Sequence, residues 1–123
     1  AIDSEGYLWT CGNNQNGQLG LGDTQNRLEL TKVGDGDGEE KFKSVSCGSY
    51  HTMVIDQNGY LWTCGSNNFS ELELTDRSAV LKLSKMSNQL FHSVSCGDYF
   101  TVAIDQEGQE RLIYSIRVRY GMV

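Results

Sequence analysis

The chain has 123 residues, 16 of them acidic and 10 of them Lys or Arg, so its formal net charge is −6. A negative segment is a poor ligand for a nucleic-acid backbone, because such binding needs several clustered cations. No apolar run is long enough to span a membrane, and no targeting segment is visible. We therefore expect no direct nucleic-acid contact and no membrane partner.

The sequence repeats itself. Residues 2–12 return 53 positions later as residues 55–65, and residues 44–50 return 49 positions later as residues 93–99. The spacing changes where Gly34–Lys41 is matched by the shorter Ser87–Leu90. A length change confined to one place indicates a surface loop. Repeats of about fifty residues with short apolar runs are typical of stacked or radially arranged units.

The repeats divide the chain into three units. Residues 1–33 form the first repeat, which is the C-terminal part of a blade, and residues 34–86 form a complete second repeat. Residues 87–123 form a partial third repeat that diverges after Gly108. With a little over two repeats, we expect the chain to be a fragment of a longer protein. Its unpaired strand edges predict that it is marginally stable or prone to aggregation when isolated.

In chain order, each unit carries the turn form Asp-x-x-Gly, at residues 3–6, 56–59 and 105–108. The Asp accepts backbone N–H bonds in a type I turn, and the Gly supplies the positive φ that closes a hairpin. In the second unit, runs of β-branched and aromatic residues flank the turn. Further short strands are expected around Leu28–Val33 and Ser44–Cys47. We predict an all-β fold, a fragment of a β-propeller with about two four-stranded antiparallel blades plus a partial third.

Residues 6–23 contain a glycine turn, an aromatic strand, a Gly-x-Asn turn and a Gly-Gln-Leu-Gly run. They resemble the repeats of the regulator of chromosome condensation family, and Cys47–Thr52 resembles that family's Gly-x-x-His-Thr element. The resemblance implies a seven-bladed β-propeller. In the second unit the Gly-Gln-Leu-Gly run becomes the degenerate Ser70–Thr75, and Phe100 replaces His51 in the third.

Residues that recur in the units are expected to build the blade rather than a function. We read His51 as a buried histidine that bonds the backbone; a general base is the alternative, although no motif places a nucleophile beside it. His92 replaces Lys43 of the other copy and is expected to be exposed. The expected structural residues are Gly12, Gly65, Gly48, Gly97, Trp9, Trp62 and His51.

The four cysteines occupy two repeated positions, each followed by glycine: Cys11 with Cys64, and Cys47 with Cys96. No Cys-x-x-Cys spacing is present. We predict buried free thiols and an intracellular protein, cytoplasmic or nuclear; zinc or disulfides are the alternatives. The acidic run Asp35–Glu40 is interpreted as a solvated loop rather than a calcium site. No metal and no cofactor are predicted.

Positions that differ between copies are where repeat scaffolds build specificity. Asp98 replaces Ser49 after a shared glycine, and we propose Asp98, Ser49, Tyr50 and Tyr99 as partner-binding residues. In the resembled family, acidic residues at such positions help exchange factors to release nucleotide from a Ran-type GTPase; an ordinary solvated carboxylate is the alternative for Asp98.

We predict a protein–protein interaction module within a propeller scaffold, and not an enzyme. Its expected partners are other proteins, among them a small GTPase, and the remaining blades of the parent propeller. The alternatives are a guanine-nucleotide exchange factor for a Ran-type small GTPase, or the regulatory propeller of a larger kinase or ubiquitin ligase.

Overall fold

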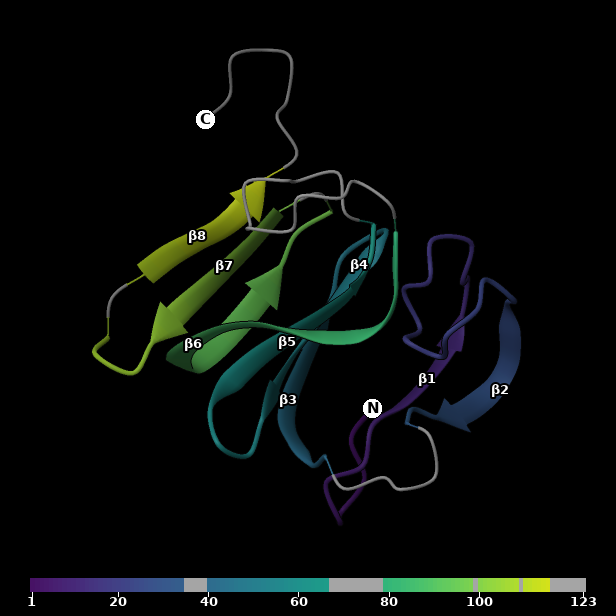
Figure 1. Cartoon of the computed structure of the whole chain (residues 1–123), viewed down its shortest axis with the longest axis horizontal. Helices are drawn as coiled ribbons and strands as arrows, with labels where there is room; N and C mark the ends of the chain where they lie inside the picture. Colours follow the sequence, from purple (N-terminus) through teal and green to yellow (C-terminus); the bar gives the residue numbers. More distant parts are fainter. Residues whose placement is uncertain (35–39, 67–78, 99, 109, 116–123) are drawn as a thin grey trace.

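The computed structural model describes residues 1–34, 40–66, 79–98, 100–108 and 110–115, and within these ranges it contains eight strands and no helix (Figure 1). A two-stranded antiparallel sheet pairs β1 (Trp9–Gly12) with β2 (Arg27–Lys32). The other six strands form one antiparallel sheet in chain order: β3 (Phe42–Cys47), β4 (His51–Asp56), β5 (Tyr60–Gly65), β6 (Val80–Cys96), β7 (Phe100–Asp105) and β8 (Glu110–Ser115). The predicted all-β fold is confirmed.

The Asp-x-x-Gly turns have the predicted geometry. In the second unit one Asp56 oxygen accepts the backbone N–H groups of Asn58 and Tyr60, each at 2.9 Å. Gly59 closes the turn with φ of +101° and donates its N–H to the Asp56 carbonyl at 3.0 Å. The first unit makes the equivalent contacts around Asp3. The turn of the second unit therefore joins β4 and β5 into a hairpin through its own aspartate, and the turn of the first unit closes the antiparallel bridge between Ile2 and Leu8.

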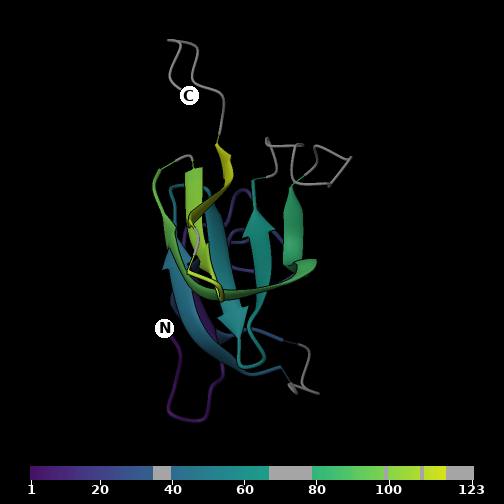
Figure 2. The same cartoon turned by 90° about the vertical axis from the view of Figure 1, so that its left-hand side faces the viewer.

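One strand, β6, belongs to two units. Its first half pairs with β5, as at Trp62↔Lys85, and its second half pairs with β7, as at Val94↔Ala103. Figure 2 shows the strand bending between these two halves. The shorter copy of the length change, Ser87–Leu90, lies inside β6. Our expectation of a loop at this position was therefore wrong for this copy, because four fewer residues leave the strand to run on from one unit into the next.

The described strands amount to one complete four-stranded unit between two incomplete ones. The complete unit consists of β3, β4, β5 and the first half of β6; β1–β2 precede it, and the second half of β6 with β7 and β8 follows it. The predicted degenerate segment, Ser70–Thr75, and most of the acidic run Asp35–Glu40 lie outside the described residues.

The core lies between neighbouring units. Met53 and Ile55 of β4 pack in a buried cluster with Phe91 and Ala103 of the third unit. Val54, on the opposite face of the same strand, packs with residues of the first unit such as Leu8. All six residues of β4 are buried, because each face of this strand is covered by a neighbouring repeat.

Candidate functional site

Two copies of the same turn meet at one end of the large sheet. The β3–β4 turn follows Cys47, the β6–β7 turn follows Cys96, and both turns lie at the end where β3 and β6 finish (Figure 1). The Ser49 N–H donates to the Asp98 carbonyl oxygen across 3.2 Å. The structure thus brings together two of the residues that we selected because they differ between the copies.

The predicted partner-binding residues that the structure describes reach solvent. Ser49 and Asp98 are exposed, and the Tyr50 side chain is 43% exposed. Tyr99 lies outside the described residues. Phe100, which the sequence singled out only as a replacement of His51, is 44% exposed beside them. We call Ser49, Tyr50, Asp98 and Phe100 the loop-end surface.

A buried layer supports the loop-end surface. The His51 side chain is 1% exposed, and its Nε2 lies 2.9 Å from the Thr101 hydroxyl of the next unit. Burial lowers the pKa of His51 to about 4, so the imidazole is neutral at pH 7. The same hydroxyl lies 3.6 Å from the Cys96 sulfur. Through Thr101, the structure places His51 at the contact between the second and third units.

The glycines after the cysteines let aromatic rings pack onto the backbone. The His51 ring lies against Gly48, and the Phe100 ring lies against Gly97 in the same way. Gly65, at the end of β5, is equally confined, because a Cβ there would meet the Tyr50 carbonyl oxygen. The adjacent Ser66 N–H donates to that oxygen at 2.7 Å. The turn that presents Tyr50 is therefore anchored to β5.

The recurring tryptophans and the remaining glycine lie away from this surface. Trp9 and Trp62 are half-buried and donate to the aspartates of their own turns. Gly12 ends β1, is exposed and has open space where a Cβ would project. His92 is exposed, as predicted.

All four cysteines are free, but they are not all buried. Cys64 is buried, its thiol donates to the Gln18 carbonyl oxygen at 3.3 Å, and burial raises its pKa to about 12. Burial also raises the pKa of Cys96, which packs on the second unit. Cys11 and Cys47 are exposed, which corrects our expectation of buried thiols. The reason is that Cys64 packs on Gln18 of the first unit and Cys96 packs on Ser46 of the second, whereas Cys11 and Cys47 have no such cover among the described residues.

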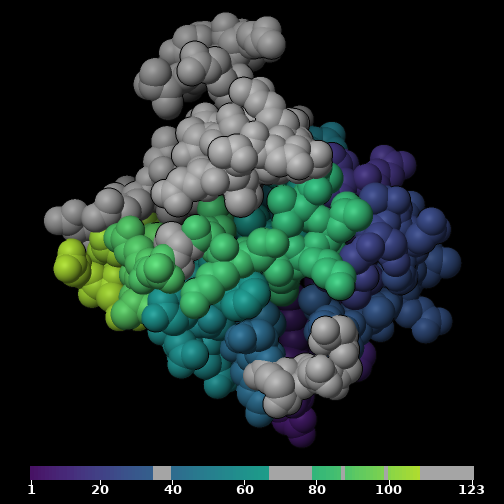
Figure 3. Space-filling view, in the orientation of Figure 1, coloured from purple at the N-terminus to yellow at the C-terminus, as the bar shows by residue number. Residues whose placement is uncertain are grey.

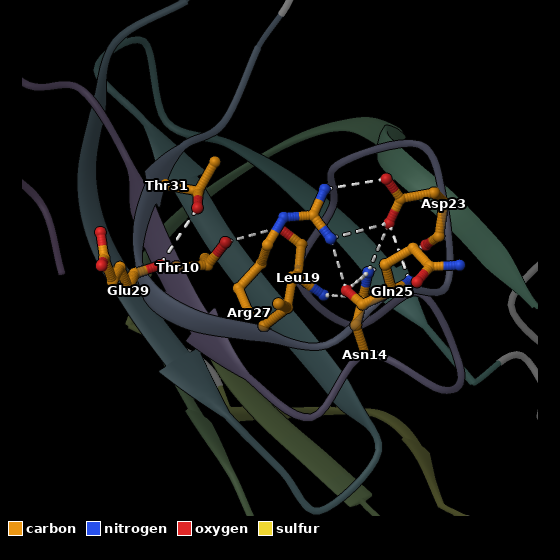
Figure 4. Close-up of polar contacts among 8 residues, drawn as sticks. All are labelled: Thr10, Asn14, Leu19, Asp23, Gln25, Arg27, Glu29 and Thr31. Atoms are coloured by element: carbon orange, nitrogen blue, oxygen red, sulfur yellow. Dashed lines mark hydrogen bonds and ion pairs between the residues drawn. The ribbon is translucent and has the colours of Figure 1, made fainter.

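The sequence reasoning missed the network that holds the first Gly-Gln-Leu-Gly loop (Figure 4). Asn14 is fully buried, and its Nδ2 donates at 3.0 Å to the Asp23 carboxylate and to the carbonyl oxygens of Asp23 and Gln25. Its Oδ1 accepts the Leu19 N–H at 3.0 Å. Arg27 forms a 2.8 Å ion pair with Asp23 and lowers the pKa of that carboxyl. The recurrence of Asp23 as Asp76 was the available signal.

Neither a metal centre nor a membrane span is found in the described part of the chain. Nowhere in these ranges do three His, Cys, Asp or Glu side chains gather closely enough to hold a metal ion. The same ranges contain no helix that is long and apolar enough to cross a bilayer.

The antiparallel units and their shared strand define a section of a β-propeller built from sequence repeats. The family model described as the regulator of chromosome condensation (RCC1) repeat matches residues 5–55 and 58–104, and a second RCC1 repeat model matches residues 42–71. The chain therefore belongs to the RCC1 repeat family, as the sequence predicted.

Known proteins resemble this chain over part of their length. It is 45% identical over 71 residues to the protein RCC2 homolog of Danio rerio, covering 58% of this chain and 14% of that protein. It is 39% identical over 71 residues to the secretion-regulating guanine nucleotide exchange factor of Bos taurus, covering 58% of this chain and 15% of that protein. The crystal structure of Prp20p from Saccharomyces cerevisiae matches with a TM-score of 0.76 and 23% identity, over 91% of this chain and 30% of that one.

Proposed function

We propose that this chain is a protein–protein interaction module whose loop-end surface contacts a partner protein. The observation that carries the proposal is the hydrogen bond from the Ser49 N–H to the Asp98 carbonyl oxygen. It sets the differing residues of two repeats side by side, in solvent, above a buried layer. Such a surface combines adaptable side chains with a rigid support, which lowers the entropic cost of binding.

The chemistry of the surface favours a partner with cationic and apolar groups. Asp98 supplies an exposed carboxylate, and Tyr50 and Phe100 supply partly exposed aromatic rings. Aromatic side chains dominate binding energies at protein interfaces, and a carboxylate steers a basic partner. The structure of Prp20p was reported with its binding properties to Gsp1p and histones, so these proteins are suitable first probes.

A direct binding measurement tests the proposal. The chain is titrated against Gsp1p and against histones, as wild type, as Asp98→Ala and as Tyr50→Ala. We expect each substitution to weaken binding of at least one probe by about tenfold, which corresponds to about 1.4 kcal/mol. Glu107→Ala is the matched control, because it also removes one exposed carboxylate but from an Asp-x-x-Gly turn. Equal losses of affinity in Asp98→Ala and Glu107→Ala would show that the effect comes from the change in net charge, and they would contradict the proposed surface.

The second candidate function is nucleotide exchange on a small GTPase. It is favoured by the 39% identity to a bovine protein named as a guanine nucleotide exchange factor and by the exposed Asp98 carboxylate. An exchange factor makes and breaks no covalent bond, so this candidate also makes the chain a binding protein rather than an enzyme. Nucleotide release from a panel of GTPases, compared between wild type and Asp98→Ala, separates it from simple binding. Release rates that stay at the spontaneous value across the panel would exclude nucleotide exchange as a function.

We also propose that the protein works inside the cell, in the cytoplasm or the nucleus. All four cysteines are free, and two of them are exposed, which suits a reducing compartment. Immunofluorescence of the intact parent protein would test this, and a secreted parent would overturn it.

A further inference from the structure

A tyrosine ring of the first unit is in contact with two lysine ammonium groups. The Lys32 Nζ lies 3.7 Å from the centroid of the Tyr7 ring, and the Lys41 Nζ lies 5.3 Å from it. Both distances are within the range of a cation–π contact. Tyr7 is half-buried, and both lysines are exposed. We call Tyr7, Lys32 and Lys41 the two-lysine site.

Hydrogen bonds within the first unit fix the backbone of two members of the site. The Tyr7 N–H donates to the Asp3 carboxylate at 2.9 Å, so the ring follows directly from the Asp-x-x-Gly turn. Lys32 lies opposite Trp9 in the antiparallel pair of β1 and β2. The ring and the first ammonium group therefore extend from backbone that is already ordered, which lowers the entropic cost of binding.

The third member, Lys41, lies between the turns of two units. Its carbonyl oxygen accepts the Gln57 N–H at 2.9 Å, and the N–H of the next residue, Phe42, donates to the Gly6 carbonyl oxygen at 2.8 Å. Figure 3 shows the blue start of β3 packed beside the N-terminal unit, which is coloured purple to blue. The second ammonium group is thus held at the first turn by contacts from both sides.

The second unit contains a copy of this site with a single lysine. The Lys85 Nζ lies 3.7 Å from the centroid of the Tyr60 ring, so the pair of one lysine and one tyrosine recurs. Leu90 stands at the position of Lys41, and its carbonyl oxygen accepts the Gln106 N–H at 3.2 Å. Since leucine makes the same backbone contact in the copy, the fold does not require the Lys41 ammonium group. That group is what distinguishes the first unit from the second.

The copy also shows that this place stays open between repeats. The second unit has a described neighbour on each side. Even so, Lys85 is exposed, Leu90 is 37% exposed and Tyr60 is half-buried. The two-lysine site is therefore not a contact between repeats, and its access to solvent does not come from a missing neighbour.

The charges of the site match a doubly charged anion. In the described ranges the ion pair is formed by Arg27 and Asp23, so no described carboxylate is paired with either lysine. A phosphorylated side chain carries a charge of about −2 and three acceptor oxygens, whereas a carboxylate neutralises only one ammonium group. A nucleic-acid backbone needs more clustered cations than two, and the chain has a net charge of −6. The match is therefore to a single phosphate group.

We propose that Tyr7, Lys32 and Lys41 form a binding site for a phosphorylated side chain on a segment of a partner protein. The two ammonium groups pair with the phosphate oxygens, and the tyrosine ring keeps both groups at one place. Lys41 precedes the start of β3, whereas the loop-end surface follows the end of that strand. The two surfaces are separate, and the inference does not rest on the proposed function.

A peptide titration tests the site. The isotope-labelled full chain is titrated with a pentapeptide that carries phosphoserine between glycines, and the backbone amide signals of Tyr7 and Lys41 are followed by NMR. The same peptide with serine or glutamate at its centre is the reference. We expect the phosphopeptide to bind at least about tenfold more tightly than the glutamate peptide, because its charge pairs with both lysines. Equal affinity for the phosphopeptide and either reference would overturn the proposal.

Three variants separate the site from the net charge. Lys41→Leu gives the first unit the side chain of its copy, and we expect it to weaken phosphopeptide binding about tenfold. Lys43→Leu removes one exposed lysine from β3 and should change the affinity by less than about twofold. Leu90→Lys places a second ammonium group near Tyr60 and should create a second site there. Equal losses in the two lysine variants, or no binding at Tyr60 in the third, would contradict the proposal.

Two further measurements address other occupants. The segment between the two lysines contains four carboxylates of its own, at Asp35, Asp37, Glu39 and Glu40. We expect the phosphopeptide to bind whether or not these residues are changed to Asn and Gln. Binding that appears only after the change would identify the chain's own carboxylates as the occupant and overturn the proposal. Displacement of the phosphopeptide by single-stranded DNA at equal phosphate concentration would identify a nucleic acid as the ligand and contradict it as well.

Discussion

The Trp62 indole N–H donates to the Asp56 carboxylate over 2.8 Å, while the other oxygen of that carboxylate holds the backbone of the turn. Trp9 and Asp3 make the same contact at 2.9 Å in the first unit. That indole is the main reason why the pKa of Asp3 lies below its usual value. In the third unit Arg111 stands at the tryptophan position, and Asp105 accepts a 3.3 Å bond from the Gln89 amide. The Trp–Asp pair therefore fixes the hairpins of the two units that retain it.

Removing the Asp56 carboxylate should destabilise the fold strongly. Asp56→Ala leaves two backbone N–H groups and the Trp62 indole without their acceptor in a site that is 3% exposed. We expect the free energy of unfolding to fall by about 2–4 kcal/mol. Asp56→Asn keeps one oxygen for the turn, and we expect it to lower the free energy of unfolding by about 1–2 kcal/mol. Urea unfolding followed by circular dichroism gives both values, and equal losses would show that the turn contributes little.

The fold should lose stability on mild acidification because of His51. Its pKa is lowered from 6.5 to about 4 in the folded chain. The unfolded chain therefore takes up a proton near pH 6.5, whereas the folded chain does so near pH 4. Stability present above pH 6.5 is lost as the pH falls towards 4. We expect a loss on the order of 2 kcal/mol across this window.

His51→Gln is the control for this pH dependence, because its amide can still bond the Thr101 hydroxyl but does not titrate. Urea midpoints measured from pH 7.5 to pH 4.5 should decline more steeply in the wild type than in the variant. Parallel curves would mean that another group causes the acid sensitivity.

Cysteines at equivalent positions of the repeats should differ in the reactivity of their thiols. Cys11 is exposed, whereas Cys64 is buried and burial raises its pKa to about 12, so a reagent in solution reaches the first thiol and not the second. We expect Cys11 and Cys47 to react with iodoacetamide about a hundredfold faster than Cys64. Peptide mass spectrometry after timed labelling of the native chain measures the rates. Similar rates at Cys11 and Cys64 would contradict the packing of Cys64 on the first unit.

The buried amide of Asn14 should hold the loop that covers β6. Asn14→Ala removes three donated bonds and one accepted bond in a fully buried position. We expect a loss of about 2–4 kcal/mol in unfolding free energy, together with faster amide exchange at Leu81–Leu83. Asn13→Ala is the neighbouring control at an exposed residue, and it should cost about 1 kcal/mol or less. Equal effects of the two substitutions would argue against the network in Figure 4.

Much of the fold could be predicted from local patterns. The recurrence of Asp-x-x-Gly located the hairpins, because the aspartate and the glycine satisfy a turn within four residues. The motifs shared with the RCC1 repeat family predicted the propeller fold. The prediction of a loop at Ser87–Leu90 was wrong, since a difference in length between two copies does not reveal that the shorter copy continues as a strand. For the candidate site, the sequence selected Ser49 and Asp98, but it could not show that one bonds the other across 3.2 Å.

By itself, the sequence determined the units of this protein: their hairpins, their strands and their membership of one repeat family. These properties follow from side chains that act on their own stretch of backbone. Only the tertiary structure decided the surroundings of equivalent residues, such as Leu28 in solvent and Leu81 under a loop. The physical reason is that a repeat buries its apolar side chains against its neighbours. The same residue type at equivalent positions of two units is therefore buried or exposed according to whether a neighbouring unit is present.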